Sequence, residues 1–437
     1  MPPFINLLYI FSIMSYEDES RSCRRDADFA EMLRKEQFDD LVFAALAMGD
    51  NISDFAARCF RRIFYLVPSI FVVSDAAQAA IKEAADGGNP HARFAYGRLL
   101  RTKNWNAGDV ETALEYFEKA YAQHLSDAGA AIANAYYAGE YGLVDYSRAK
   151  QYLVEALEQS SEFAAVLYIN WLNRGTYGFN LDTALAIKTS SAIIENEDLE
   201  GMPSAIWKSL RGVAYYREGN VEAACQDLEA AANNGIIDAW SFLALFKCTD
   251  PETGEYTDVD EYERLLNEGI DHHCGDCLML SNEPFVTMFD SLDEDTRERI
   301  TGSVLQDFDR AVELGSAEAA KLLGDIYRDG LCGQPEDINK AWSYYARAAL
   351  WRYAQAYESM FDMAVKGIVK QEQDSCDLLA LNGARYGSQE LIIETVAAYY
   401  AGRLTAFASE IEQYYVPVYQ AHEEDESDDD GRYDAWS

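Results

Sequence analysis

The seven residues Asp-His-His-Cys-Gly-Asp-Cys at positions 271–277 form the densest group of chemistry-bearing side chains in the sequence. His272, His273, Cys274 and Cys277 together offer two imidazoles and two thiols, which are the ligands that zinc prefers. The Cys-x-x-Cys spacing is also that of a redox pair. One hypothesis for the function is therefore a metal-binding or redox protein centred on this segment.

The rest of the sequence does not complete such a site. There are five histidines and eight cysteines, with no second Cys-x-x-Cys and no spaced His pair. The motifs of nucleotide-binding loops, zinc proteases and serine hydrolases are absent as well. Scattered cysteines in a chain of 437 residues are typical of the reducing cytosol. We therefore expect a protein that is not an enzyme and needs no cofactor, with Cys277 serving packing instead of chemistry.

A repeated pattern of two short helices explains why Cys277 is a packing residue. In residues 315–350, Ala319 and Gly324 share one face of a first helix with the apolar residues between them. The small Gly324 allows a second helix to approach closely, and Gly330 ends the first helix. Asp337 then stands where a second helix begins, since Asp is a good N-cap residue.

The small residue at the Ala319 position, here called the anchor, recurs at intervals of 34–42 residues. A single helix pair cannot bury its apolar face alone, so neighbouring pairs must stack. The sequence thus predicts an all-α, right-handed α-solenoid of about ten helix pairs. The ten anchors are Ala56, Ala92, Ala128, Ala164, Ala205, Ala239, Cys277, Ala319, Ala356 and Leu391.

The stretch "AAKLLGDIYRDGLCGQPEDINKAWSYYARAAL" resembles a Sel1-like repeat, a relative of the tetratricopeptide repeat. "LRGVAYYREGNVEAACQDLEAA", from Leu210, is similar to a plain tetratricopeptide unit. The weakest match follows Cys277, where Pro284 falls inside the expected first helix and predicts a break or kink. The resemblance covers roughly residues 51–421. It implies a non-enzymatic interaction scaffold or adaptor that binds a protein or peptide in the concave groove of the array.

The resemblance also implies which side chains line that groove, namely those two, six and nine residues after an anchor. Asn offers a donor and an acceptor to a peptide backbone, and Arg can fork onto a carboxylate. The alternative is that these residues are ordinary solvated surface. The candidate groove residues are Phe94, Arg98, Arg101, Asn134, Tyr137, Asn170, Asn173 and Trp207.

The charge is strongly acidic, with 75 acidic and 36 basic residues and a net charge of −39. Such a surface repels nucleic acid phosphates and anionic lipid head groups, so neither is expected as a partner. It keeps the protein soluble, or it favours a basic partner. A further hypothesis for the function is therefore an acidic decoy or inhibitor that occupies a basic protein.

The ends of the chain differ from the repeats. The start "MPPFINLLYIFSIM" lacks the basic flank of a signal peptide and is shorter than the roughly 20 residues that span a bilayer. We expect a cytoplasmic protein, with Met14 as a candidate initiator. "EEDESDDD", from Glu423, is too acidic to fold. The predicted division is an apolar lead-in over 1–27, a capping helix over 28–50, the array with its C-terminal cap over 51–421, and a disordered acidic tail over 422–437.

Overall fold

The computed structural model describes residues 28–29, 32, 37–65, 73–103, 107–142, 144–174, 181–196, 202–250, 253 and 255–421. The predictions for 1–27, including Met14, and for 422–437 lie outside these residues. Within them, the regular structure is helical, and the only other pairing is an isolated bridge between Thr249 and Tyr256. The prediction of an all-α chain is therefore confirmed.

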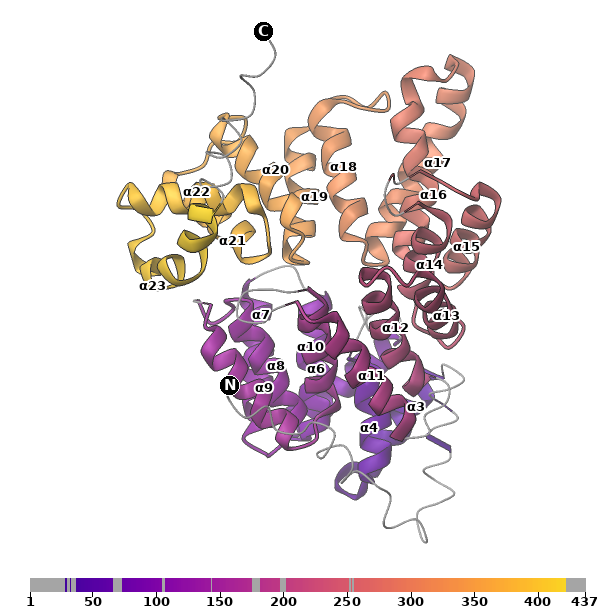
Figure 1. Ribbon diagram of the computed structural model, residues 1–437, viewed down its shortest axis with the longest axis vertical. Coiled ribbons are helices and arrows are strands. Elements are labelled where there is room, and N and C mark those ends of the chain that lie inside the picture. The colour runs from indigo at the N-terminus through magenta and orange to yellow at the C-terminus, as the bar shows by residue number, and fades with distance from the viewer. Residues whose placement is uncertain are drawn as a thin grey trace. The chain divides into compact units, whose positions relative to one another are not determined.

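The helices form a series of pairs that follow one another along the chain (Figure 1). α3 (Phe38–Met48) precedes the first pair and lies within the predicted capping segment. The first helices of the pairs are α4 (Asp54–Arg62), α6 (Pro90–Lys103), α8 (Ser126–Tyr137), α10 (Glu162–Arg174), α12 (Met202–Arg217), α14 (Ala239–Cys248), α16 (Gly275–Met288), α18 (Ala317–Asp329), α20 (Ala354–Val365) and α22 (Gln389–Tyr400).

The second helices alternate with them, and consecutive helices pack on one another, as α6 does on α7 and α18 on α19. The second helices are α5 (Asp75–Asp86), α7 (Ala107–Tyr121), α9 (Tyr146–Glu158), α11 (Thr183–Asn196), α13 (Val221–Ala232), α15 (Val259–Asp271), α17 (Glu294–Glu313), α19 (Ile338–Leu350) and α21 (Gln373–Arg385). After α22 the chain continues through η4 (Thr405–Phe407), α23 (Ala408–Glu410) and the π-helical turn η5 (Ile411–Tyr415). The predicted C-terminal cap is thus helical.

All ten anchors lie in the first helices, and each is at most 1% exposed. First helices also pack on the next first helix along the chain, as α4 does on α6 and α12 on α14. This is the stacking that a helix pair needs in order to bury its apolar face. The helical repeat array that the anchor spacing predicts is confirmed, with ten first helices and nine second helices among the described residues.

The turn between successive pairs has one conformation throughout most of the array. In eight of the ten repeats, the residue four before the anchor has a positive φ, from 57° at Ser160 to 103° at Gly88. The N–H group of the next residue then donates to a carbonyl eight residues before the anchor, as Ser316 does to Ala311 at 2.9 Å. This is the Schellman ending of a helix. The eight positive-φ residues are Gly88, His124, Ser160, Gly235, His273, Gly315, Arg352 and Gly387.

Glycines set the contact between the two helices of a pair, as predicted for Gly324. A Cβ atom on Gly324 would overlap the ring of Tyr345, and one on Gly97 would overlap the ring of Phe117. The ring of the second helix therefore packs directly on the backbone of the first. The expected break at Pro284 is wrong, because α16 continues to Met288 before it tightens into the 3₁₀ turn η3 (Phe289–Ser291).

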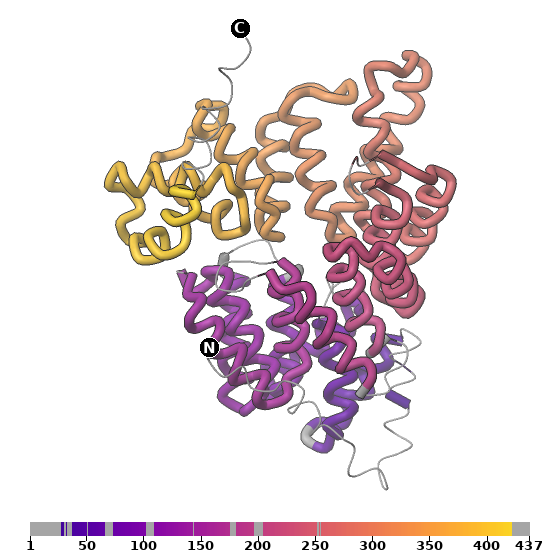
Figure 2. The backbone as a smooth tube through the Cα atoms, in the orientation of Figure 1, coloured from indigo at the N-terminus to yellow at the C-terminus, as the bar shows by residue number. Residues whose placement is uncertain are grey.

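The chain divides into two compact units. Unit 1 contains residues 1–135, 146–281 and 313–315, and unit 2 contains residues 136–145, 282–312 and 316–437. Figure 2 traces the backbone with its colour running along the chain, so that the successive helix pairs of each unit can be followed. Among the described residues, no helix is long and apolar enough to cross a membrane.

Candidate functional site

The His/Cys segment forms the turn between α15 and α16. Cys274 is the residue before α16, and its Sγ accepts a hydrogen bond from the N–H group of Cys277 at 3.4 Å. Ser316 and Ser388 hold the same place before α18 and α22, where each hydroxyl accepts from the anchor N–H group. Cys274 therefore caps a helix with sulfur where other repeats use a serine oxygen.

Cys277 is the anchor of its repeat and is fully buried against Gly269 of α15. Hydrogen bonding to Cys274, together with burial, raises the pKa of the Cys277 thiol, so the thiolate needed for metal binding or redox exchange is disfavoured. His272 is exposed and stacks on Trp240, with 5.7 Å between ring centroids. The described part of the chain contains no group of three or more His, Cys, Asp or Glu side chains that could hold a metal ion.

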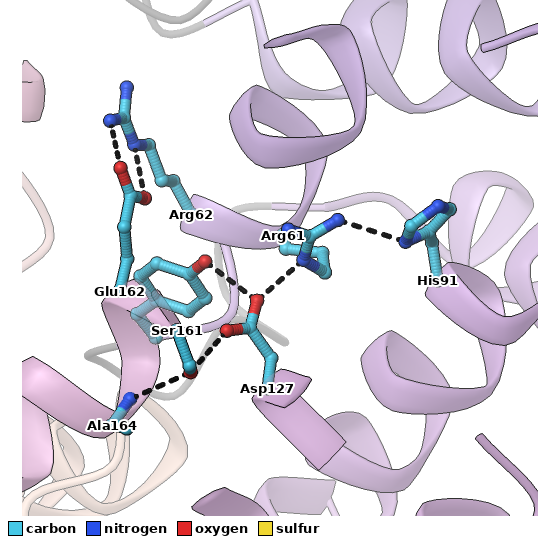
Figure 3. Close-up of polar contacts among 8 residues, drawn as sticks. Arg61, Arg62, His91, Asp127, Ser161, Glu162 and Ala164 are labelled. Carbon is cyan, nitrogen blue, oxygen red and sulfur yellow. Dashed lines mark hydrogen bonds and ion pairs between the residues drawn. The ribbon is translucent and has the colours of Figure 1, made fainter. Parts of the chain in front are cut away.

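A buried polar cluster joins four successive repeats of unit 1 (Figure 3). Arg61, near the end of α4, donates from Nε to Oδ2 of Asp127 at 2.5 Å and lies 2.9 Å from Nδ1 of His91. Asp127 also accepts from the hydroxyl of Tyr65 at 2.8 Å and from that of Ser161 at 2.5 Å. One carboxylate on α8, in the third repeat, thus receives hydrogen bonds from side chains of the first and fourth repeats.

Arg62 makes a second, forked ion pair next to this one. Its Nε and Nη2 atoms donate to the two carboxylate oxygens of Glu162 at 2.9 and 2.5 Å. The two side chains are 7% and 3% exposed, although they are 100 residues apart in sequence. We call Arg61, Arg62 and Tyr65, together with Asp127, Ser161 and Glu162, the inner clasp.

Aromatic rings surround the tyrosine of the inner clasp. Tyr65 stacks on Phe163 with 5.4 Å between centroids and meets Phe94 edge-on at 6.3 Å. Arg98 lies over the face of Phe163 and donates from Nε to the carbonyl of Phe64 at 2.8 Å. Its Nη2 atom donates to the carbonyl of Tyr65 at 3.3 Å. An arginine six residues after an anchor therefore holds main-chain carbonyl groups.

Burial and the charges of the inner clasp shift the pKa values of its member Asp127 and of the neighbouring His91. Burial alone would raise the pKa of Asp127, but the charge of Arg61 and the hydrogen bonds from Ser161, Arg61 and Tyr65 lower it below its usual value. Burial, and then the charge of Arg61, lowers the pKa of His91 to about 4. At neutral pH Asp127 is therefore ionised, and the neighbouring His91 is neutral.

Three of the eight predicted groove residues are interior. Phe94, Asn173 and Trp207 are at most 3% exposed, so their prediction as groove-lining side chains is wrong. Asn173 donates to the carbonyl of Leu210 at 2.9 Å. Arg98 is occupied by the carbonyl groups of the first repeat. The physical reason is contact with neighbouring repeats, because the ring of Phe94 meets Tyr65 of the first repeat and Asn173 binds Leu210 of the fifth.

The remaining predicted residues, Arg101, Asn134, Tyr137 and Asn170, are partly exposed. Tyr137 is the last residue of α8 and belongs to unit 2. Asn134 and Asn170 lie in unit 1, on α8 and α10, six residues after the anchors of adjacent repeats. Neither Asn side chain makes a hydrogen bond to another described residue. Each keeps a donor and an acceptor available.

The clasp residues of the first repeat were missed, although the sequence carried their signal. Arg62 and Tyr65 lie six and nine residues after the anchor Ala56, at the same two distances from the anchor that were used to select Arg98 and Arg101. Counting those distances from the anchor of the first repeat would have found both residues. Asp127 and Glu162, which lie one and two residues before the anchors of later repeats, had no such signal.

A second pair of inner carboxylates lies further along unit 1. Asp238 and Asp276 each directly precede an anchor, as Asp127 does. Burial, and then the negative charge of Asp276, raises the pKa of Asp238 to about 7. Asp238 is therefore partly protonated at neutral pH.

Comparison with known proteins finds helical repeat structures. No family model matches the chain, and no curated protein matches it. A Sel1 repeat protein from Oxalobacter formigenes is similar over 75% of this chain and 92% of its own, with 18% identity and a TM-score of 0.36. The protective antigen c5321 of uropathogenic Escherichia coli, which has an SLR fold, is similar over 90% and 97%, with 14% identity and a TM-score of 0.34. The human IFIT1 dimer with PPP-AAAA is similar over 75% and 83%, with 14% identity and a TM-score of 0.40. The solved structures similar to this chain thus include Sel1 repeat proteins.

Proposed function

We propose that the protein is a non-enzymatic interaction scaffold that holds an extended segment of a partner protein on the inner face of unit 1. Asn134 and Asn170 bind the main chain of that segment. The observation that carries the proposal is that these two amides occupy the same position in adjacent repeats, are partly exposed, and make no hydrogen bond to another described residue.

The residue at the same position of the preceding repeat, Arg98, supports the same chemistry. Arg98 lies six residues after its anchor and donates to the carbonyl groups of Phe64 and Tyr65. A side chain at this position can therefore reach a polypeptide backbone. An amide can bind a backbone through both its donor and its acceptor, so two amides in register would fix an extended chain.

The test begins with a partner captured from lysate of the source cells and then purified. Asn134→Ala combined with Asn170→Ala should weaken its binding at least tenfold, while the helical content stays unchanged. Asn339→Ala, at an exposed position of α19, is the matched control and should leave binding unchanged. Equal affinity for the double variant and the control would refute the assignment of these residues.

An acidic decoy of a basic protein is the second candidate, favoured by the net charge of −39. Binding by a decoy would depend more strongly on salt than binding by the scaffold, because exposed charges are screened over about 8–10 Å at physiological ionic strength. Binding that is lost at high salt and is insensitive to the Asn variants would favour the decoy. A cytoplasmic location and the absence of nucleic acid partners remain predictions of the same account.

A further inference from the structure

The first repeat contributes to the inner clasp through one short segment. Arg61 and Arg62 lie in the last turn of α4, and Tyr65 follows three residues later. Two carboxylates receive the two guanidinium groups, and two phenylalanine rings receive the tyrosine. The segment is therefore bound by the later repeats in the way a ligand is bound.

We propose that the surface formed by Asp127, Glu162, Phe94, Phe163 and Arg98 is a recognition site for the end of a basic helix. The helix carries two consecutive arginines and a tyrosine three residues after the second. The chain's own residues 61–65 fill this site in the free protein, and a partner with such a helix competes for it. This inference rests on the proposed function, because it describes a second partner-binding site on the same helical array.

The chemistry of the site selects arginine over other residues. Glu162 accepts from two nitrogens of one guanidinium, a geometry that lysine cannot reproduce. Both carboxylates are buried, and a buried carboxylate requires an opposite charge. Two consecutive arginines are thus needed to neutralise Asp127 and Glu162 together.

The rest of the site selects an aromatic residue at the end of a helix. The ring of Tyr65 contacts Phe94 and Phe163, and its hydroxyl donates to Asp127. Arg98 binds the carbonyl groups of Phe64 and Tyr65. Carbonyl groups at the C-terminal end of a helix have no hydrogen-bond partner within the helix, so they are available to such an arginine. An extended basic segment would present its carbonyl groups differently.

The packing of α4 makes exchange of this helix feasible. α4 has nine residues and packs mainly on α3 and α6, whereas α6, α12 and α18 each pack closely on the second helix of their own pair. The inner clasp supplies the side-chain hydrogen bonds that join its last turn to the third and fourth repeats. Weakening the clasp should therefore release α4 before other first helices.

The experiment uses the full chain and a labelled 12-residue peptide with the sequence of residues 54–65. Arg61→Lys with Arg62→Lys keeps both positive charges in the protein but removes the forked bonds to Asp127 and Glu162. The variant should bind the peptide at least tenfold more tightly than the unaltered protein does, measured by fluorescence anisotropy. The same peptide with both arginines replaced by glutamine should bind neither protein.

Adding Glu162→Gln to the lysine variant should abolish peptide binding, whereas adding Glu158→Gln, at an exposed position of α9, should not. Adding Asn134→Ala and Asn170→Ala should also leave peptide binding intact, which separates this site from the proposed groove. If a folded lysine variant does not bind the peptide, or binds the glutamine peptide equally well, the proposal is wrong.

A second measurement covers the case in which the lysine variant does not fold. Excess peptide added to the unaltered protein should accelerate hydrogen exchange in α4, because the displaced helix loses its protection. Exchange in α18 should be unaffected. Unchanged exchange in α4 at saturating peptide would overturn the proposal.

Discussion

At the scale of single residues, the carboxylates that directly precede an anchor have different surroundings in different repeats of unit 1. Asp127 is matched by Arg61 and remains ionised. Asp238 holds the same place in a later repeat, but its carboxylate lies close enough to that of Asp276 for their charges to repel. The same position in the repeat therefore stabilises the fold in one case and strains it in the other.

The strain at Asp238 predicts a defined pH dependence. Its pKa rises from a usual value near 3.8 to about 7 in the folded protein, so the folded state binds more protons than the unfolded state between these values. The free energy of unfolding contributed by this group therefore falls as the pH rises from about 4 to 7. The Asp238→Asn variant has no carboxylate at this position, so its free energy of unfolding should not fall in this way.

Urea unfolding of Asp238→Asn and of the unaltered protein should give similar stability near pH 4. The variant should become the more stable protein as the pH rises, with the difference complete above about pH 7. Asp260→Asn, at an exposed position of α15, serves as the control and should run parallel to the unaltered protein. A variant curve that also runs parallel would show that Asp238 titrates normally.

At the scale of the helix pair, local rules predicted most of the structure. Small anchors, a glycine under a second-helix ring and an Asp at the start of α19 are all local requirements, and Gly324, Tyr345 and Asp337 meet them. The burial of Phe94 and Asn173 was not predicted, because each side chain contacts a neighbouring repeat, through Tyr65 and Leu210 respectively. The pattern within a single repeat does not specify such contacts.

The turn between pairs gives a prediction at this scale, because one backbone conformation is occupied by different residue types. The position four before the anchor has a φ of 66° at His124 and 101° at Gly387. A side chain in this left-handed region costs about 1 kcal/mol relative to glycine. His124→Gly should therefore raise the free energy of unfolding by about 1 kcal/mol, and Gly387→Ala should lower it by a similar amount.

The control for both variants is Gly302→Ala in α17, where no atom lies within 4 Å of the added Cβ and φ is not positive. It should stabilise the protein by about 0.5–1 kcal/mol, since alanine is the better helix former. Equilibrium unfolding in urea measures all three. Destabilisation by both His124→Gly and Gly387→Ala would contradict the assignment of a shared turn.

At the scale of the whole molecule, the array is a series of similar helix pairs whose inner positions have different roles. In the first four repeats, arginines, carboxylates and aromatic rings contact one another in a buried cluster. Asn134 and Asn170 lie in this same unit without such partners among the described residues. We therefore propose that the two amides bind a partner and that the inner clasp binds the chain's own first repeat.

The most direct test of this assignment is the selection of 12-residue peptides from a random displayed library on the full chain, followed by affinity measurement. The account predicts that selected peptides bind the Asn134→Ala and Asn170→Ala double variant at least tenfold more weakly than they bind the unaltered protein. They should bind Asn339→Ala as tightly as the unaltered protein. Selected peptides that bind all three proteins equally would contradict the claim that the inner face of unit 1 is the binding surface.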